Sequence, residues 1–392
     1  MPHEMQGVAH TDGNTLPGGR AASVERDLLG RSHDDLRRLM EEIGEPAYRG
    51  SQLYHALYAE RRFDFALMSN LPAALRQRLA NGVRIGMPKI LRRFHSNDGS
   101  VRYLLGLNDG VATQRASTRA RVEAVFMPSD GRQTICISTQ AGCGVDCHFC
   151  LTAQLGLVRN LTAGEILAQV LIALEDHRDL LAPRTNVVLM GQGEPLLNYE
   201  AVMAALRIML DADGMALAAR HVTLSTSGIV PGIERLAQEK IRPKLAISLN
   251  ASNDEERDAI MPINRKYPLT ALLAACRKYP LRPWERLTFE YVLLGGFNDS
   301  PEDARRVAGL VSGLRAKVNL IPWNPGELPY HPPPAERVSE FRDALAAKGI
   351  PTSVRNSRGQ DVCAACGQLA LSEAAPVVST INPTPPPLGP SA

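Results

Sequence analysis

The sequence has few cysteines, few aromatic residues and no long apolar run. Its 392 residues include 7 cysteines, too few for a disulfide-stabilised scaffold, and 5% aromatic residues in an otherwise ordinary soluble composition. No apolar stretch approaches the roughly 18 residues that cross a bilayer. The first thirty residues lack the basic start and apolar stretch of a secretory signal. These absences argue against collagen-like, mucin-like, secreted and membrane proteins, and they predict a cytoplasmic protein with reduced thiols.

The charges are balanced over the whole chain but not along it. The formal net charge is +3, which favours no class of partner. Residues 46–95 carry nine basic residues against Glu60 and Asp64, a net charge of +7. The nine are Arg49, Arg61, Arg62, Arg76, Arg78, Arg84, Lys89, Arg92 and Arg93. This concentration, interleaved with aromatic residues, predicts contact with nucleic acid through Arg92 and Arg93 among others; a solubilising helical face is the alternative.

Composition and periodicity divide the chain into five parts. Residues 1–32 and the Pro-rich residues 373–392 are expected to be disordered tails. Residues 33–95 are expected to form a small helical accessory domain that binds RNA. Its helices are expected at residues 33–44, 51–61 and 71–82, with Ser51 as the N-cap of the second. Residues 96–132 are expected to form a β linker or extension, with a hairpin-type turn at Asp98 and Gly99 and a basic loop at residues 111–121.

Residues 133–372 show six strand-then-helix units. Their strands are continuous apolar runs, as parallel strands buried on both faces should be. Thr162 and Glu165 form a capping box at the start of the first helix. Right-handed crossovers favour an α/β fold with a partial (βα)6 barrel, and a doubly wound sheet is the alternative. In both folds ligands bind at the carboxyl ends of the strands. The strand runs are residues 134–139, 186–191, 221–227, 244–250, 286–294 and 316–323, and helical segments at residues 254–260 and 269–278 follow the fourth.

Three cysteines follow the first of these strands on one short loop. Cys143, Cys147 and Cys150 have the spacing Cys-x3-Cys-x2-Cys. Three thiolates can hold three irons of a cubane cluster and leave the fourth iron open. A zinc site would need a fourth ligand, for which His148 stands at poor spacing within the loop. The ligand count favours the cluster over zinc, and both over a site without metal.

Polar residues also end the later strands. They are Gly193 and Glu194 after the second strand, Ser225 in the third, Ser248 and Asn250 at the fourth, and Asn324 after the sixth. Each alone is more typical of a turn than of a ligand contact. Because all of them fall on one rim of the predicted barrel, together they predict a shared ligand.

The motifs resemble those of a known family. CISTQAGCGVDCHFC, LMGQGEP, VTLSTSG, IPWNP and DVCAACGQL are similar to the RlmN-type radical S-adenosylmethionine RNA adenine methyltransferases, over about residues 46–369. The three cysteines alone indicate the superfamily. The combination of CISTQAGC with AACGQL is typical of this family, to which the Cfr enzymes are related.

The resemblance implies a set of site residues. Cys143, Cys147 and Cys150 would bind a [4Fe-4S] cluster. Cys366 would accept a methyl group from one S-adenosylmethionine, and a second would yield a radical that activates this methyl group for addition to adenine. Cys136 would resolve the protein–RNA crosslink by forming a transient disulfide with Cys366, and Glu123 would accept a proton. The S-adenosylmethionine pocket would consist of Gly193, Glu194, Ser225, Ser248, Leu249, Asn250 and Asn324.

The resemblance also implies substrates and partners. The family methylates carbon 2 of adenine in 23S rRNA, at the peptidyl-transferase centre, and in tRNA beside the anticodon. A radical is needed because this ring carbon offers neither a lone pair nor an acidic proton. An electron donor such as flavodoxin or ferredoxin and a monomeric state are expected. The alternatives are a Cfr-like carbon 8 methyltransferase and a non-catalytic RNA-binding protein with a structural zinc.

Overall fold

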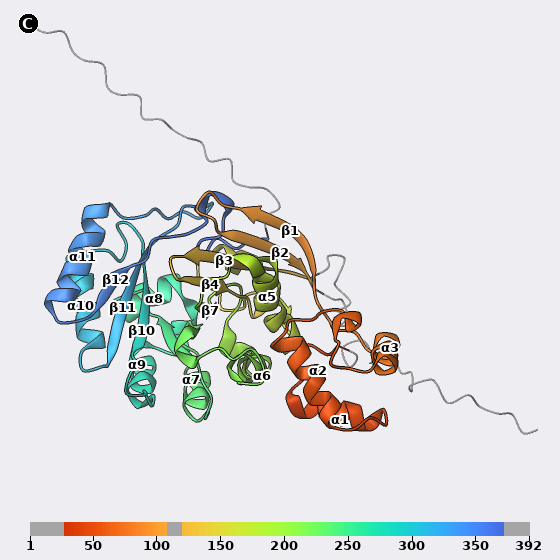
Figure 1. Ribbon diagram of the computed structural model, residues 1–392. Helices are drawn as coiled ribbons and strands as arrows, with labels where there is room; N and C mark the ends of the chain where they lie inside the picture. The colour runs from red at the N-terminus through yellow and green to blue at the C-terminus, as the bar shows by residue number, and fades with distance from the viewer. Residues whose placement is uncertain (1–26, 108–119, 372–392) are drawn as a thin grey trace, which may run out of the picture.

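The computed structural model describes residues 27–107 and 120–371 (Figure 1). Its main feature is a sheet of ten strands in the order β1-β2-β3-β4-β7-β8-β9-β10-β11-β12. The strands are β1 (Lys89–His95), β2 (Val101–Gly106), β3 (Arg121–Ser129), β4 (Arg132–Cys136), β7 (Thr185–Leu189), β8 (Val222–Thr226), β9 (Lys244–Ser248), β10 (Leu287–Leu293), β11 (Ala316–Pro322) and β12 (Thr352–Val354). The strands from β4 to β12 pair in parallel. The partial (βα)6 barrel is therefore confirmed, with β12 as an additional short strand.

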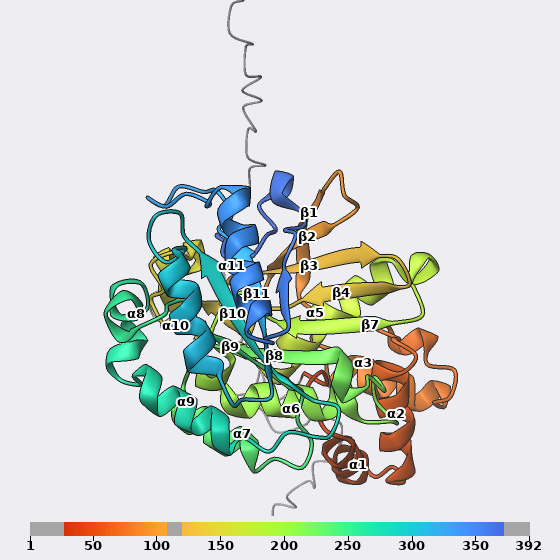
Figure 2. The same cartoon turned by 90° about the vertical axis from the view of Figure 1, so that its left-hand side faces the viewer.

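Helices cover the outer face of the barrel. They are α5 (Ala163–Asp176), α6 (Tyr199–Leu210), α7 (Val230–Ala237), α9 (Leu269–Lys278), α10 (Pro301–Val311) and α11 (Ala335–Ala347). The short helix α8 (Asp254–Ile260) instead lies at the carboxyl ends of the strands, where the His148 backbone N–H donates to the Ile260 carbonyl. Figure 2 shows α9, α10 and α11 outside the strands. The predicted capping box at the start of α5 is present, since Thr162 and Glu165 each accept from the other's backbone N–H. Alternate residues of the strands thus face the helices, and the others face the concave side, where a ligand can enter.

The accessory module contains α1 (His33–Glu42), α2 (Tyr48–Tyr58) and α3 (Ala73–Gly82). Three expectations for this region were wrong. The helix α2 begins three residues before Ser51, which lies inside it. Leu28 and Leu29, assigned to the disordered tail, are buried in the core. Lys89–His95 forms strand β1 rather than helix, and its mostly exposed, basic residues show no apolar period that sequence could reveal.

The strands β1, β2 and β3 extend the barrel sheet, beginning at Lys89. They form an antiparallel meander that continues the barrel sheet, because β3 pairs with β4 from Val125 opposite Cys136 to Ser129 opposite Arg132. The turn expected at Asp98 and Gly99 joins β1 to β2. The tails at residues 1–26 and 372–392 lie outside the described residues, as do residues 108–119, which include most of the basic loop predicted at residues 111–121.

Much of the basic charge of the accessory module is neutralised within the fold. Five arginines of residues 46–95 form ion pairs: Arg61 with Glu175, Arg62 with Glu60, Arg78 with Glu45, Arg84 with Asp27 and Arg93 with Asp176. Four of these carboxylates lie outside residues 46–95. The net charge of +7 for that segment therefore overstates the positive electrostatic potential that a ligand would experience there. Arg93 binds Asp176 through two hydrogen bonds of 2.8 Å and thereby joins β1 to α5. That RNA contacts this module stays a prediction.

No helix within residues 27–107 and 120–371 has the length and apolar character needed to span a bilayer.

Candidate active site

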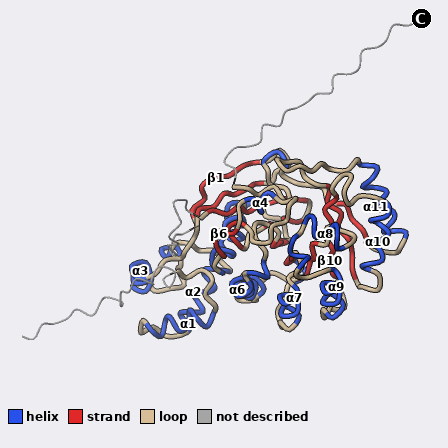
Figure 3. Tube along the Cα trace, turned by 180° about the vertical axis from the view of Figure 1, so that it is seen from behind, coloured by secondary structure: helices blue, strands red, loops and turns tan. Residues whose placement is uncertain are grey.

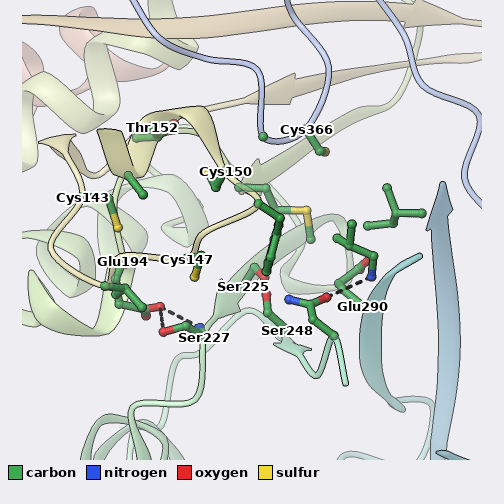
Figure 4. Close-up of a pocket in the computed structure, with 18 of the residues that line it drawn as sticks. Cys143, Cys147, Cys150, Thr152, Glu194, Ser225, Ser227, Ser248, Glu290 and Cys366 are labelled. Atoms are coloured by element: carbon green, nitrogen blue, oxygen red, sulfur yellow. Dashed lines mark hydrogen bonds between the residues drawn. The ribbon is translucent and has the colours of Figure 1, made fainter. Parts of the chain in front are cut away.

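The three clustered cysteines lie on a loop held by a small hairpin. Strands β5 (Gln140–Gly142) and β6 (Leu157–Asn160) pair on either side of the loop, and α4 (Leu151–Gln154) follows Cys150 (Figure 3). The hairpin requires glycine at Gly142, where φ is +75° and an added Cβ would lie 1.8 Å from the Gly156 carbonyl oxygen. Cys143, Cys147 and Cys150 all line one cavity (Figure 4). Sequence spacing alone identified these three thiols as neighbours.

This thiol set fits an iron–sulfur cluster with one open iron. All three sulfurs are free thiols and face the cavity that also contains Glu194. His148, the candidate fourth zinc ligand, is not among the residues lining this cavity, and its Nδ1 lies 2.8 Å from the Ala259 carbonyl oxygen. In the described part of the chain, no three His, Cys, Asp or Glu side chains converge closely enough to hold a single metal ion. A cubane is larger than one ion and binds its ligands farther apart.

Glu194 is held in place by three donors. Its carboxylate accepts from the Ser227 backbone N–H at 2.7 Å, the Ser227 hydroxyl at 2.8 Å and the Leu196 N–H at 3.0 Å. Burial raises the pKa of Glu194, and these hydrogen bonds oppose the shift. Gly193, at φ +96°, lets the chain pass Gln140, whose backbone N would lie 2.7 Å from an added Cβ. The turn therefore presents a fixed acceptor beside the cysteine loop, suited to an ammonium group.

The other predicted cofactor residues divide into two groups. Ser225, Ser248, Asn250 and Asn324 line the same cavity as the cysteines. Leu249 is fully buried in the apolar core and is not among the cavity-lining residues. Asn250 is already engaged by the protein, since its Oδ1 accepts from the Val292 N–H at 3.0 Å and its Nδ2 contacts the Met261 sulfur. Because both ends of the Asn250 side chain are hydrogen-bonded within the protein, Asn250 forms part of the cavity wall.

Asn324 binds the segment that carries Cys366. Its Nδ2 donates to the Cys366 carbonyl oxygen at 3.0 Å, and its Oδ1 accepts from Gln360 Nε2 at 3.0 Å. Further contacts hold the same segment against the cysteine loop. The Leu151 N–H donates to the Gly367 carbonyl, and the Thr152 hydroxyl donates to the Leu369 carbonyl. The structure thus gives Asn324 a positioning role that the resemblance to the family did not suggest.

We expect Asn324→Ala to reduce methyl loading on Cys366 by about ten- to a hundredfold, since small misplacement of a reacting group is costly. The dissociation constant for S-adenosylmethionine should change by less than about threefold, the effect of a weak hydrogen bond. Peptide mass analysis and equilibrium binding measure the two quantities. Gln360→Ala, which leaves the bond to Cys366 intact, is the milder control. Equal losses of binding and loading would instead make Asn324 a cofactor contact.

The two remaining candidate catalytic thiols share a second cavity. Cys136, at the end of β4, and Cys366 both line it, together with Met190 and Arg355. This cavity adjoins the first, because Cys150, Met190, Arg355 and Cys366 line both. Burial, with a smaller contribution from Cys366, raises the pKa of Cys136 to about 12, so this thiol stays protonated at neutral pH. The cavities connect the cluster loop to both thiols.

Sequence reasoning missed the charged groups beside these thiols. Arg355 follows β12, and the proximity of Cys366, together with Glu290 and Cys136, raises its pKa against the effect of burial. Glu290 lines the first cavity, and one of its oxygens accepts from Asn319 Nδ2 at 3.0 Å. Neither residue belongs to a spacing pattern, and only strand alternation on β10 could have indicated that Glu290 faces inward.

Glu123 lies under the C-terminal segment. It is fully buried, forms an ion pair with the buried Arg102, and accepts from the Leu371 backbone N–H at 3.0 Å. It is not among the residues lining the two cavities. The additional thiol Cys363 is half-buried with Arg102 and Glu123 as its charged neighbours. Cys276 is buried in α9, where it packs as a small core residue.

Comparison with known proteins assigns the family. The radical SAM superfamily matches residues 137–308, and the N-terminal domain of ribosomal RNA large subunit methyltransferases matches residues 26–85. The chain is 49% identical over 352 residues to the probable dual-specificity RNA methyltransferase RlmN of Koribacter versatilis, covering 85% of this chain and 99% of the relative. It is 48% identical to the probable dual-specificity RNA methyltransferase RlmN of Thermus thermophilus, covering 89% of this chain and 96% of the relative.

A solved structure agrees. The chain is similar to a radical SAM methyltransferase from Sphaerobacter thermophilus, with a TM-score of 0.82, 42% sequence identity and coverage of 88% of this chain and 99% of that one. The superfamily implies an iron–sulfur cluster and S-adenosylmethionine, which the cysteine loop and Glu194 fit. The names of these relatives favour the RlmN enzymes over the carbon 8 enzymes. On these grounds the chain belongs to the RlmN family of radical S-adenosylmethionine RNA methyltransferases.

Proposed function

We propose that this enzyme methylates carbon 2 of adenine in RNA, with Cys366 as the methyl carrier and Cys136 as the resolving thiol. The observation that carries the proposal is the shared cavity. Cys136 and Cys366 line it together, and it opens into the cavity lined by the cluster cysteines. A methyl group on Cys366 would therefore face both the cofactor site and the second thiol.

The bound cluster and two molecules of S-adenosylmethionine per turnover supply a methyl group and a carbon-centred radical. The protein's own part is placement. Glu194 and the cavity wall orient the cofactor, while Asn324 and Thr152 fix the segment of Cys366.

Once the base is bonded through the methylene to Cys366, the adduct would lose its carbon 2 proton and one electron, which returns to the oxidised cluster. The Cys136 thiol then gives up its proton as its sulfur bonds to the Cys366 sulfur. The electron pair of the breaking carbon–sulfur bond goes to the methylene carbon, which takes up a proton and leaves as the methyl group of the base. The product enzyme holds a disulfide, which a thiol reductant must reopen.

The substrates we infer are 23S rRNA at the peptidyl-transferase centre and the adenine beside the anticodon of tRNA. Two relatives are named as dual-specificity RNA methyltransferases, which supports two kinds of RNA substrate. The enzyme would act as a monomer in the cytoplasm, with flavodoxin or ferredoxin as electron donor. Glu123 stays our candidate proton acceptor; its burial raises its pKa, although Arg102 opposes the shift.

The test is the nucleoside formed. Anaerobically purified enzyme with about four irons per chain should convert rRNA and tRNA from cells lacking the host enzyme to 2-methyladenosine, identified by chromatography and mass spectrometry against standards. Cys276→Ala, which removes a buried thiol outside both cavities, should behave as wild type. A methyl group at carbon 8, or a colourless zinc protein without activity, would contradict the proposal.

A further inference from the structure

A group of cationic side chains lies at the opposite end of the strands from the cofactor cavity. Arg132 begins β4, Arg184 precedes β7, Arg220 and His221 precede β8, and Lys244 begins β9. Because β4, β7, β8 and β9 are parallel neighbours, their first residues meet at one edge of the sheet. These five side chains line one open cavity on the concave side of the barrel. We call Arg132, Arg184, Arg220 and Lys244 the inner-face cations.

Within residues 27–107 and 120–371, none of the inner-face cations forms an ion pair with a carboxylate, in contrast to the paired arginines of the accessory module. Burial and then Lys317 lower the pKa of Lys244, and Glu285 opposes this shift. Burial followed by Arg220, Arg184 and Lys244 lowers the pKa of His221. Mutually repelling cations in one concave surface are the arrangement that a polyanion neutralises.

The cationic cavity continues to the catalytic thiols. Arg132 and Thr134 line both this cavity and the one that contains Cys136 and Cys366. Arg132 and Cys136 lie on the same strand, four residues apart, which at the rise of a β-strand is about 13 Å. A base held at the thiols would thus keep its neighbouring phosphates within reach of the inner-face cations.

We infer that the inner-face cations bind backbone phosphates of the RNA substrate and lead the strand to Cys366. The inference rests on the proposed function and deepens it, because it assigns the RNA track to the barrel itself. A phosphate-binding role explains why the inner-face cations line the open cavity on the concave side of the barrel. Most of the paired arginines of the accessory module, in contrast, form ion pairs that hold segments of the protein together. Phosphate contacts of this kind position the substrate without reading its sequence.

The experiment compares two double variants of equal charge. Arg184→Gln with Arg220→Gln removes two exposed inner-face cations. Arg277→Gln with Lys278→Gln removes two exposed cations from the outer helix α9, where the described residues offer them no ion pair. Binding of an unmodified tRNA transcript is measured over a series of KCl concentrations. A plot of the logarithm of the binding constant against the logarithm of the KCl concentration has a negative slope. In the inner-face variant this slope should be shallower by about 2, one for each lost phosphate contact, whereas the control should keep the wild-type slope.

Two further readings separate the possible outcomes. The inner-face variant should cleave S-adenosylmethionine without RNA at the wild-type rate and keep the wild-type melting temperature. Equal slopes for the inner-face variant and wild type would overturn the inference, as would a loss of slope found instead in Arg92→Ala with Arg93→Ala. Failure of the proposed function would give a different result: the wild-type enzyme would form no 2-methyladenosine. Its RNA binding would still depend more steeply on salt than that of the inner-face variant.

Discussion

Cys136→Ala should accumulate a covalent protein–RNA adduct, whereas Cys366→Ala should form neither adduct nor product. Cys366 carries the methyl group in the proposed reaction, so its loss removes the atom to which the base becomes attached. Cys136 acts later and only breaks the bond to the base. The structure supports this division, since both thiols line one cavity but only Cys366 also lines the cofactor cavity.

Denaturing gel electrophoresis with labelled RNA measures the adduct, and mass analysis of the linked peptide locates it. Two other thiols provide the controls. Cys363→Ala should keep most of the activity, because Cys363 lies outside both cavities, and Cys276→Ala should resemble wild type. An adduct in Cys366→Ala, or a methyl group on Cys363, would show that the carrier sulfur is wrongly assigned.

The largest expected loss of stability is for Arg257→Met. This fully buried guanidinium donates to the carbonyl oxygens of Leu249, Ser227 and Ser248 and to the side chain of Asn264. Those three carbonyls lie at or just after the ends of β8 and β9, where the rim of the cofactor cavity begins. Methionine fills the space but leaves several buried acceptors unpaired, each costing about 1–3 kcal/mol.

We expect the free energy of unfolding to fall by about 3 kcal/mol or more, and the melting temperature by roughly 6–12 °C. Differential scanning calorimetry of the cluster-free protein measures the loss without interference from cofactor binding. Arg277→Met, an exposed arginine on α9, should change the melting temperature by less than about 2 °C. A similarly small change in Arg257→Met would mean that water or rearranged donors satisfy the carbonyls.

Repeating apolar runs made the barrel predictable. Helices α8 and α9 begin and end at the expected residues, and the six long parallel strands lie where continuous apolar segments predicted them. The strand β1 was missed because an exposed edge strand needs no alternating apolar face; only Phe94 in it is buried. The strand β12 has only three residues, too few for any period to show.

The site was predictable where one loop carries the chemistry and less so where distant segments meet. The spacing of Cys143, Cys147 and Cys150 is local, and it predicted their common cavity. Arg257 binds backbone carbonyls of other segments, and Arg355 lies near the thiols Cys136 and Cys366. Residue spacing along the sequence does not reveal such contacts between distant segments. The ion pairs that neutralise the accessory module are likewise tertiary, so counting charges along residues 46–95 overstated its field.

Two of the hydrogen bonds that hold the segment bearing Cys366 join residues far apart in the chain. Thr152 and Leu369 are separated by 217 positions, and Glu123 and Leu371 by 248. Such contacts form late in folding, because the loops they close must first be ordered by the intervening sheet. During synthesis the amino-terminal parts fold first. The two reactive sulfurs therefore meet only in a nearly complete molecule, which protects the growing chain from a premature disulfide between Cys136 and Cys366.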